Sequence, residues 1–215
     1  MKGGGLMSLY EFLHENYGEN EPILVSEIQI EGMSDANLRQ QIKKLADTGK
    51  IKRYDAGIYF IPKQTTFKSE SMIPRDAVIE KKYLKDGDMT CGYISGMMFA
   101  NQLGLTTQVP AVYEIVTNRA TSDYRQTSLT SVKVILRKPK VTVTKDNYRI
   151  LQFLDLLKDI DSVAEVEGDG LRQRILSYMK DMMFTFSMLE PYLSYYPDKL
   201  YRNMYKAGIL SGVST

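Results

Sequence analysis

Residues 34–61 constrain the fold of this chain most, because they predict a capped helix followed at once by a tight hairpin. Ser34 is a typical N-cap residue, and Gly49 can end the helix in the left-handed conformation. Apolar side chains recur between them at the spacing of one buried helix face: Leu38, Ile42 and Leu45. The run Asp55-Ala-Gly57 then fits a three-residue hairpin turn with Gly57 in the left-handed conformation. A helix followed by a hairpin is the order of a winged helix-turn-helix domain.

Charge is distributed unevenly over this region. Residues 1–35 hold one base against seven acids, whereas residues 36–63 hold seven bases against two acids. Phosphate binding requires bases concentrated on one surface, and amide and arginine side chains can read adenine and guanine in the major groove. The side chains expected to face DNA are Asn37, Arg39, Gln40, Lys43, Lys44, Lys50, Lys52 and Arg53. The alternative is a solvated face on a domain that contacts protein.

The length of 215 residues permits two compact domains. We predict an α+β chain with a winged helix-turn-helix domain at residues 1–63, a linker at 64–73, and a mixed α/β domain at 74–215 with a helical last third. No run is long and apolar enough for a membrane span, and the N-terminus lacks a signal-peptide core. We therefore expect a cytoplasmic protein with no membrane partner.

Apolar periodicity gives the expected elements of both domains. Helices are expected at 6–17, 26–30, 34–48, 75–84, 92–104 (capped by Ser95), 148–160, 171–189 and 198–209. Strands are expected at 112–117 and 129–137, with a further one at 141–143 an open alternative and a loop at 118–128.

Little in the sequence suggests catalysis. One cysteine, Cys91, and one histidine, His14, exclude an internal disulfide and a Cys/His zinc site. The phosphate-loop, dinucleotide and nucleophile-elbow motifs are absent. We predict no enzyme, no cofactor and no metal. A magnesium-dependent nuclease using Glu114 and Lys133, with Asp76 or Glu80, is the alternative, but such strand residues more often form a surface pair.

The C-terminal third is rich in tyrosine and methionine, which are enriched at protein interfaces. Most of these side chains fit helix core stripes. A terminal helix keeps one exposed side, so the interface candidates are Tyr201, Arg202 and Tyr205.

Two stretches carry a resemblance to a known family. The run Leu45–Tyr54 followed by Gly57–Pro62 resembles the winged-helix half of AbiEi-type antitoxins. The run Gly92–Gly96, then Leu103–Pro110 and Tyr113–Thr117, is similar to the start of their second domain and is the more specific signal. The resemblance spans roughly residues 7–140 and does not reach the helical third.

The resemblance implies a type IV toxin–antitoxin role. In that family the N-terminal domain binds inverted repeats upstream of its own operon and represses it. The second domain counters a toxin that resembles nucleotidyltransferases, usually without a tight complex. The leading hypothesis is thus a DNA-binding autorepressor and antitoxin. The alternatives are a plain transcriptional regulator with a ligand-binding or dimerisation domain, and a nuclease-like enzyme.

Overall fold

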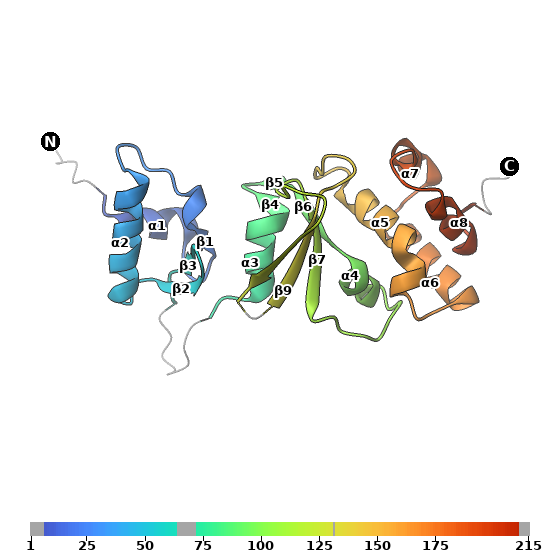
Figure 1. The fold of residues 1–215 in the computed structure, drawn as a ribbon, viewed down its shortest axis with the longest axis horizontal. Helices are drawn as coiled ribbons and strands as arrows, with labels where there is room; N and C mark the ends of the chain where they lie inside the picture. The colour runs from blue at the N-terminus through green and yellow to red at the C-terminus, as the bar shows by residue number, and fades with distance from the viewer. Residues whose placement is uncertain (1–6, 64–71, 131, 211–215) are drawn as a thin grey trace. The chain divides into compact units, whose positions relative to one another are not determined.

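The computed structural model describes residues 7–63, 72–130 and 132–210. The chain forms two compact units, residues 1–82 and 83–215. The α+β class is confirmed: a helix and a small antiparallel sheet come first, then a mixed sheet, then a helical C-terminal third (Figure 1). Residues 64–71 of the predicted linker lie outside the described residues, so its limits stay a prediction.

The first unit combines two α-helices with a three-stranded sheet before its last helix. Its elements are α1 (Leu9–Tyr17), β1 (Ile23–Leu24), a 3-10 turn (Val25–Glu27), α2 (Asp35–Asp47), β2 (Lys52–Asp55), β3 (Ile58–Phe60) and α3 (Arg75–Ile79). The sheet has the order β1-β3-β2, and both pairings are antiparallel. The helix begun by α3 continues as a π-helix, Glu80–Leu84, which contains the boundary between the units.

Two predicted boundaries of this unit were wrong. Helix α1 begins at Leu9 because Ser8 caps it: the Glu11 amide donates to Ser8 Oγ at 3.3 Å, and the Ser8 amide donates to Glu11 Oε2 at 2.8 Å. The helix expected at 26–30 is a single 3-10 turn, after which Ile28 is extended and buried in the core.

An apolar cluster joins the two helices and the sheet of the first unit. Its most deeply buried members come from α1, β1 and α2 and from the residues just before β2 and just after β3: Leu13, Ile23, Ile42, Ile51 and Ile61. Burial of side chains of this size contributes about 1.5–3 kcal/mol each. The cluster therefore fixes which side of α2 faces inward.

The second unit places a four-stranded mixed sheet before a group of helices (Figure 1). Its elements are β4 (Lys85–Asp86), β5 (Met89–Thr90), β6 (Gly92–Ser95), α4 (Gly96–Gln102), β7 (Val112–Thr117), β8 (Arg125–Leu129), β9 (Val132–Arg137), α5 (Tyr148–Val163), α6 (Gly168–Asp181), α7 (Phe186–Leu193) and α8 (Lys199–Lys206). The sheet has the order β6-β7-β9-β8, in which β7 and β9 are parallel and the other pairs antiparallel.

The segment 92–104 contains the expected helix only after its predicted N-cap residue, Ser95. Its first four residues form β6, which pairs with β7, and Gly96 at φ 64° turns the chain into α4. Gly92 is required in the strand, since a Cβ there would lie 2.5 Å from the Tyr83 carbonyl oxygen. Sheet pairing therefore prevailed over the helical spacing of the apolar residues.

Three further predictions in this unit need correction. Part of the expected loop 118–128 belongs to β8, which ends at Leu129, so β9 begins at Val132. Residues 141–143 form no strand. The helix expected at 171–189 is divided into α6 and α7, because Met183 takes the left-handed φ of 55° between them. Such a residue cannot continue a right-handed helix.

Helix α5 is the centre of the second core. Eight of its residues are buried, and Phe153 contacts the rings of Tyr178 and Phe184 at centroid distances of 5.5 and 5.8 Å. One buried acid lies among them: the Tyr93 hydroxyl donates to Asp155 Oδ2 at 2.7 Å, and burial raises the pKa of this carboxyl. The bond joins α5 to β6.

The loop between α4 and β7 is held by one carboxylate from the α5–α6 connection. Oε2 of Glu165 accepts bonds from the Thr106 hydroxyl and the Thr107 amide, both at 2.8 Å, and Oε1 accepts from the Gln108 side chain at 2.7 Å. These donors, of which the Thr107 amide has the largest effect, lower the pKa of Glu165 from 4.5 to about 2. The run Thr106–Pro110 that contributed to the family resemblance thus begins with a carboxylate-binding loop.

We expect Glu165→Gln to lower the melting temperature at neutral pH, because the neutral side chain loses charge-assisted bonds. Folding depresses this pKa, so its stabilisation is present above the ordinary value of 4.5 and is lost as the pH falls toward about 2. Thermal melts of both chains from about pH 7 to about pH 3 should therefore converge on the acid side. Glu190→Gln, on the exposed side of α7, is the matched control. A difference in melting temperature between the two chains that stays the same at every pH would contradict this account.

Candidate nucleic-acid interface

Helix α2 is delimited at both ends by local contacts. The Asn37 amide donates to Ser34 Oγ at 3.4 Å, which confirms the predicted cap. At the other end Gly49 has a φ of 73°, and the Lys50 amide donates to the Leu45 carbonyl at 3.0 Å. The helix is therefore specified by its own sequence as well as by the core.

Two buried residues, Leu38 and Ile42, fix the inward side of α2, and Met33 and Leu45 pack partly against the same cluster. Because successive residues advance by about 100°, Gln40 and Lys43 must lie opposite this stripe. Of the predicted DNA-facing residues all are exposed except Lys52, which is half-buried. The helix thus presents a polar, basic side to solvent.

The hairpin that follows α2 has Gly57 in the predicted left-handed conformation, but its turn has two residues and not the expected three, because Asp55 belongs to β2. Asp55 pairs with Ile58, which leaves Ala56 and Gly57 as the turn, and Gly57 takes a φ of 71°. The register shifts between Arg53 and Asp55, so the first strand carries an irregularity there. The Arg53 Nε donates to the Asp55 carbonyl at 3.3 Å, which holds this base on the hairpin backbone.

Two members of the predicted set have other contacts in the structure. The ammonium of Lys50 lies 5.2 Å from the centre of the Tyr10 ring on α1. The Asn37 Oδ1 accepts a bond from Gln41 Nε2 at 3.2 Å, so one of its hydrogen-bonding groups is occupied within the helix. The basic residues whose placement depends on α2 itself are Arg39, Lys43 and Lys44.

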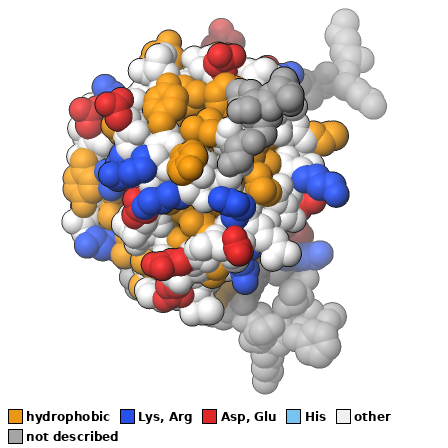
Figure 2. All heavy atoms as spheres, turned by 90° about the vertical axis from the view of Figure 1, so that its right-hand side faces the viewer, with side chains coloured by type: hydrophobic (Ala, Val, Ile, Leu, Met, Phe, Trp, Pro, Cys, Tyr) orange, Lys and Arg blue, Asp and Glu red, His pale blue; other side chains and the backbone are white. Residues whose placement is uncertain are grey.

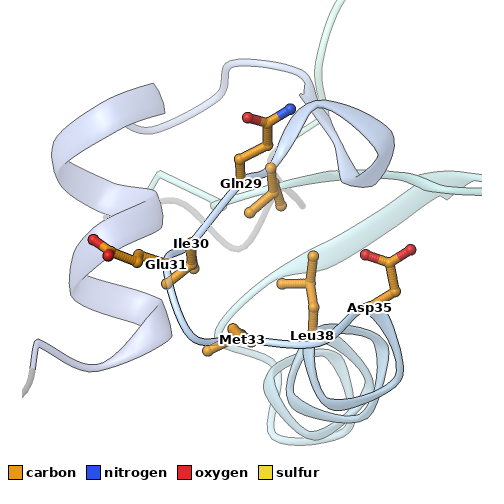
Figure 3. Close-up of a pocket in the computed structure, with 7 residues that line it drawn as sticks. Gln29, Ile30, Glu31, Met33, Asp35 and Leu38 are labelled. Atoms are coloured by element: carbon orange, nitrogen blue, oxygen red, sulfur yellow. The ribbon is translucent and has the colours of Figure 1, made fainter.

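Acidic residues lie at the beginning of α2. A pocket of about 430 Å³ opens there, with Asp35 and Leu38 on the helix and Gln29, Ile30 and Met33 on the preceding segment (Figure 3). Glu31 also lines it. Carboxylates repel phosphate, and Asp47 at the last residue of α2 is exposed too, so the part of α2 suited to a nucleic-acid backbone is its middle, around Gln40 and Lys43.

The predicted protein-interface residues are exposed on α8. Tyr201 and Tyr205 are 41% and 68% exposed. The Arg202 guanidinium lies 3.9 Å from Asp161, which gives this base an acidic neighbour. Figure 2 faces the helical end of the chain and shows hydrophobic side chains interspersed with charged ones. Tyr196, by contrast, is buried and its hydroxyl donates to the Leu151 carbonyl at 3.4 Å.

The surface pair expected between Glu114 and Lys133 does not form. Glu114 Oε2 instead lies 3.5 Å from the Arg137 guanidinium, because the parallel register sets Val112, not Glu114, beside Lys133. Within residues 7–63, 72–130 and 132–210, no group of three or more His, Cys, Asp or Glu side chains could hold a metal ion. Cys91 is buried, and burial raises the pKa of its thiol.

In the described part of the chain, no helix has the length and apolar character needed to cross a membrane. No protein-family model matches the sequence, and no curated protein matches it.

Proposed function

We propose that this chain is a cytoplasmic DNA-binding transcriptional autorepressor and the antitoxin of a type IV toxin–antitoxin system. The first unit is a winged helix-turn-helix domain that reads inverted repeats in its own operator. The second unit opposes a nucleotidyltransferase-like toxin without requiring a stable complex with it.

The observation that carries DNA binding is the outward side of α2. Leu38 and Ile42 anchor the helix, so Gln40 and Lys43 project from the opposite side at positions suited to base edges and phosphates. The sheet order β1-β3-β2 places a hairpin directly after this helix, as a winged domain requires. Arg53 on that hairpin supplies a further cation.

The antitoxin role is supported by the resemblance of residues 92–117 to the second domain of AbiEi-type antitoxins. In this chain these residues comprise β6, α4, the loop bound by Glu165, and β7. Because the loop is closed within the chain, its Thr106–Gln108 donors serve the fold, and no antitoxicity residue is assigned to it.

The test of the antitoxin role is the neighbouring gene. We expect the adjacent reading frame to be lethal when expressed alone and tolerated when this chain is co-expressed. Rescue should also occur with the full-length Gln40→Ala/Lys43→Ala chain, because operator reading and antitoxicity are assigned to different units. Colony counts after induction of each gene measure both results. Lethality that the chain fails to relieve would refute the antitoxin role and leave DNA binding untouched.

A second candidate function is a plain winged-helix regulator that senses a small molecule. The observation favouring it is a pocket of about 650 Å³ in the second unit, within the range of small-ligand sites. Its lining includes Met89, Val143 and Lys145, and Arg119, which donates to Asp86 at 3.0 Å. This candidate predicts operator binding together with no protection from the neighbouring gene product.

A further inference from the structure

One half of the sheet in the second unit carries an ordered set of polar and basic side chains. Strands β8 and β9 pair in antiparallel register, with Gln126 opposite Ile135 and Ser128 opposite Lys133. Side chains alternate along a strand, so Lys133, Ile135 and Arg137 share the face opposite to the buried valines and leucine of β9. Lys133 and Arg137 are four residues apart and hence about 13 Å from each other along the strand.

This face is open to solvent. Lys133, Gln126 and Ser128 are exposed, and the Arg137 side chain is 45% exposed. Tyr124, just before β8, is 53% exposed, and its ring centre lies 5.4 Å from the Arg137 guanidinium carbon. Strand β8 is an edge of the sheet. We call this set, Tyr124, Gln126, Ser128, Lys133 and Arg137, the β8–β9 face.

The sequence around this face is the second basic region of the chain. Residues 119–149 contain eight lysines and arginines against two acids, whereas the rest of the chain has more acids than bases. The acid that lies on the face is Glu114 of β7, which pairs with Arg137 at 3.5 Å. A phosphate group would compete with this carboxylate for the same guanidinium.

These features fit one kind of partner. Concentrated bases complement a polyanion, and lysine is depleted at protein–protein interfaces. An exposed aromatic ring beside arginine can stack on an unpaired base, while the bases of a duplex are already stacked. Gln126 and Ser128 can bond the 2′-hydroxyl, which distinguishes RNA from DNA. We propose that the β8–β9 face binds single-stranded RNA. Lys133 and Arg137 bind its phosphates, and Tyr124 stacks on a base.

The test uses the full-length chain and a fluorescein-labelled 20-nucleotide oligouridylate, followed by fluorescence anisotropy at several salt concentrations. We expect Lys133→Ala/Arg137→Ala to weaken binding at least tenfold and to reduce the salt slope by about 1.4, from about 0.7 for each lost phosphate contact. Glu114→Gln should tighten binding. Glutamine has nearly the same shape as glutamate but no negative charge, so Arg137 is free to bind phosphate. Tyr124→Leu should weaken binding at least about fivefold.

Arg172→Ala/Lys180→Ala is the matched control, since it also removes one arginine and one lysine, but from exposed positions of α6. It should leave RNA binding unchanged. Equal loss from this control, or undiminished binding by Lys133→Ala/Arg137→Ala, would overturn the proposal. Equal affinity for the deoxyribonucleotide strand, or equal competition by a duplex of the same length, would also overturn it. None of these outcomes depends on operator binding by the first unit.

Discussion

Replacing Gln40 and Lys43 together by alanine is expected to abolish specific binding to DNA from upstream of the chain's own gene. Both side chains are exposed on α2, opposite the stripe formed by Leu38 and Ile42. A bidentate base contact is worth about 1–3 kcal/mol, and loss of one phosphate contact reduces the salt slope by about 0.9. The affinity should therefore fall to the level of an unrelated duplex, as measured by gel shift at several salt concentrations.

The matched control is Gln173→Ala/Lys180→Ala, which removes the same two residue types from exposed positions of α6. It should leave operator binding unchanged. Neither pair lies in a core cluster, so both variants should melt at the temperature of the unaltered chain. Specific binding that survives the α2 substitutions would show that this helix does not read the operator.

The second large effect is expected from Phe153→Ala in α5. Phe153 is fully buried and contacts the rings of Tyr178 and Phe184, so its truncation removes apolar burial and leaves a cavity at the centre of the helical core. Such a change costs about 3–5 kcal/mol, a large part of the stability of a domain. Urea unfolding followed by circular dichroism should show a lower midpoint for the second unit.

Tyr205→Ala is the control for this substitution, because it also truncates an aromatic side chain but at a position 68% exposed. It should cost little stability. Operator binding should persist in the Phe153→Ala chain, since the core that positions α2 belongs to the first unit. If the Phe153→Ala chain lost operator binding when its second unit unfolds, the two units would not be independent. A change below about 1 kcal/mol would show that α5 does not hold the core.

Caps, turn residues and apolar spacing predicted the structure correctly where it depends on residues that are neighbours in the sequence. Ser34 and Gly49 delimit α2 as predicted, Gly57 makes the hairpin turn, and β7 has the predicted limits. The exposed side of α2 followed from helical spacing alone. A second basic region at 119–149 was present in the sequence, and counting charges beyond the first domain would have found it.

The sequence by itself determined the α+β class and the basic side of α2, because capping, turn and periodicity act over a few residues. Tertiary structure decided the strand pairings and side-chain contacts that join residues far apart in the sequence. Residues 92–95 have helical spacing but form β6, since β7 offers them backbone hydrogen bonds. Glu165 closes the Thr106–Gln108 loop from 57 to 59 positions away. Glu114 meets Arg137 and not Lys133, because the parallel register of β7 and β9 sets that pairing.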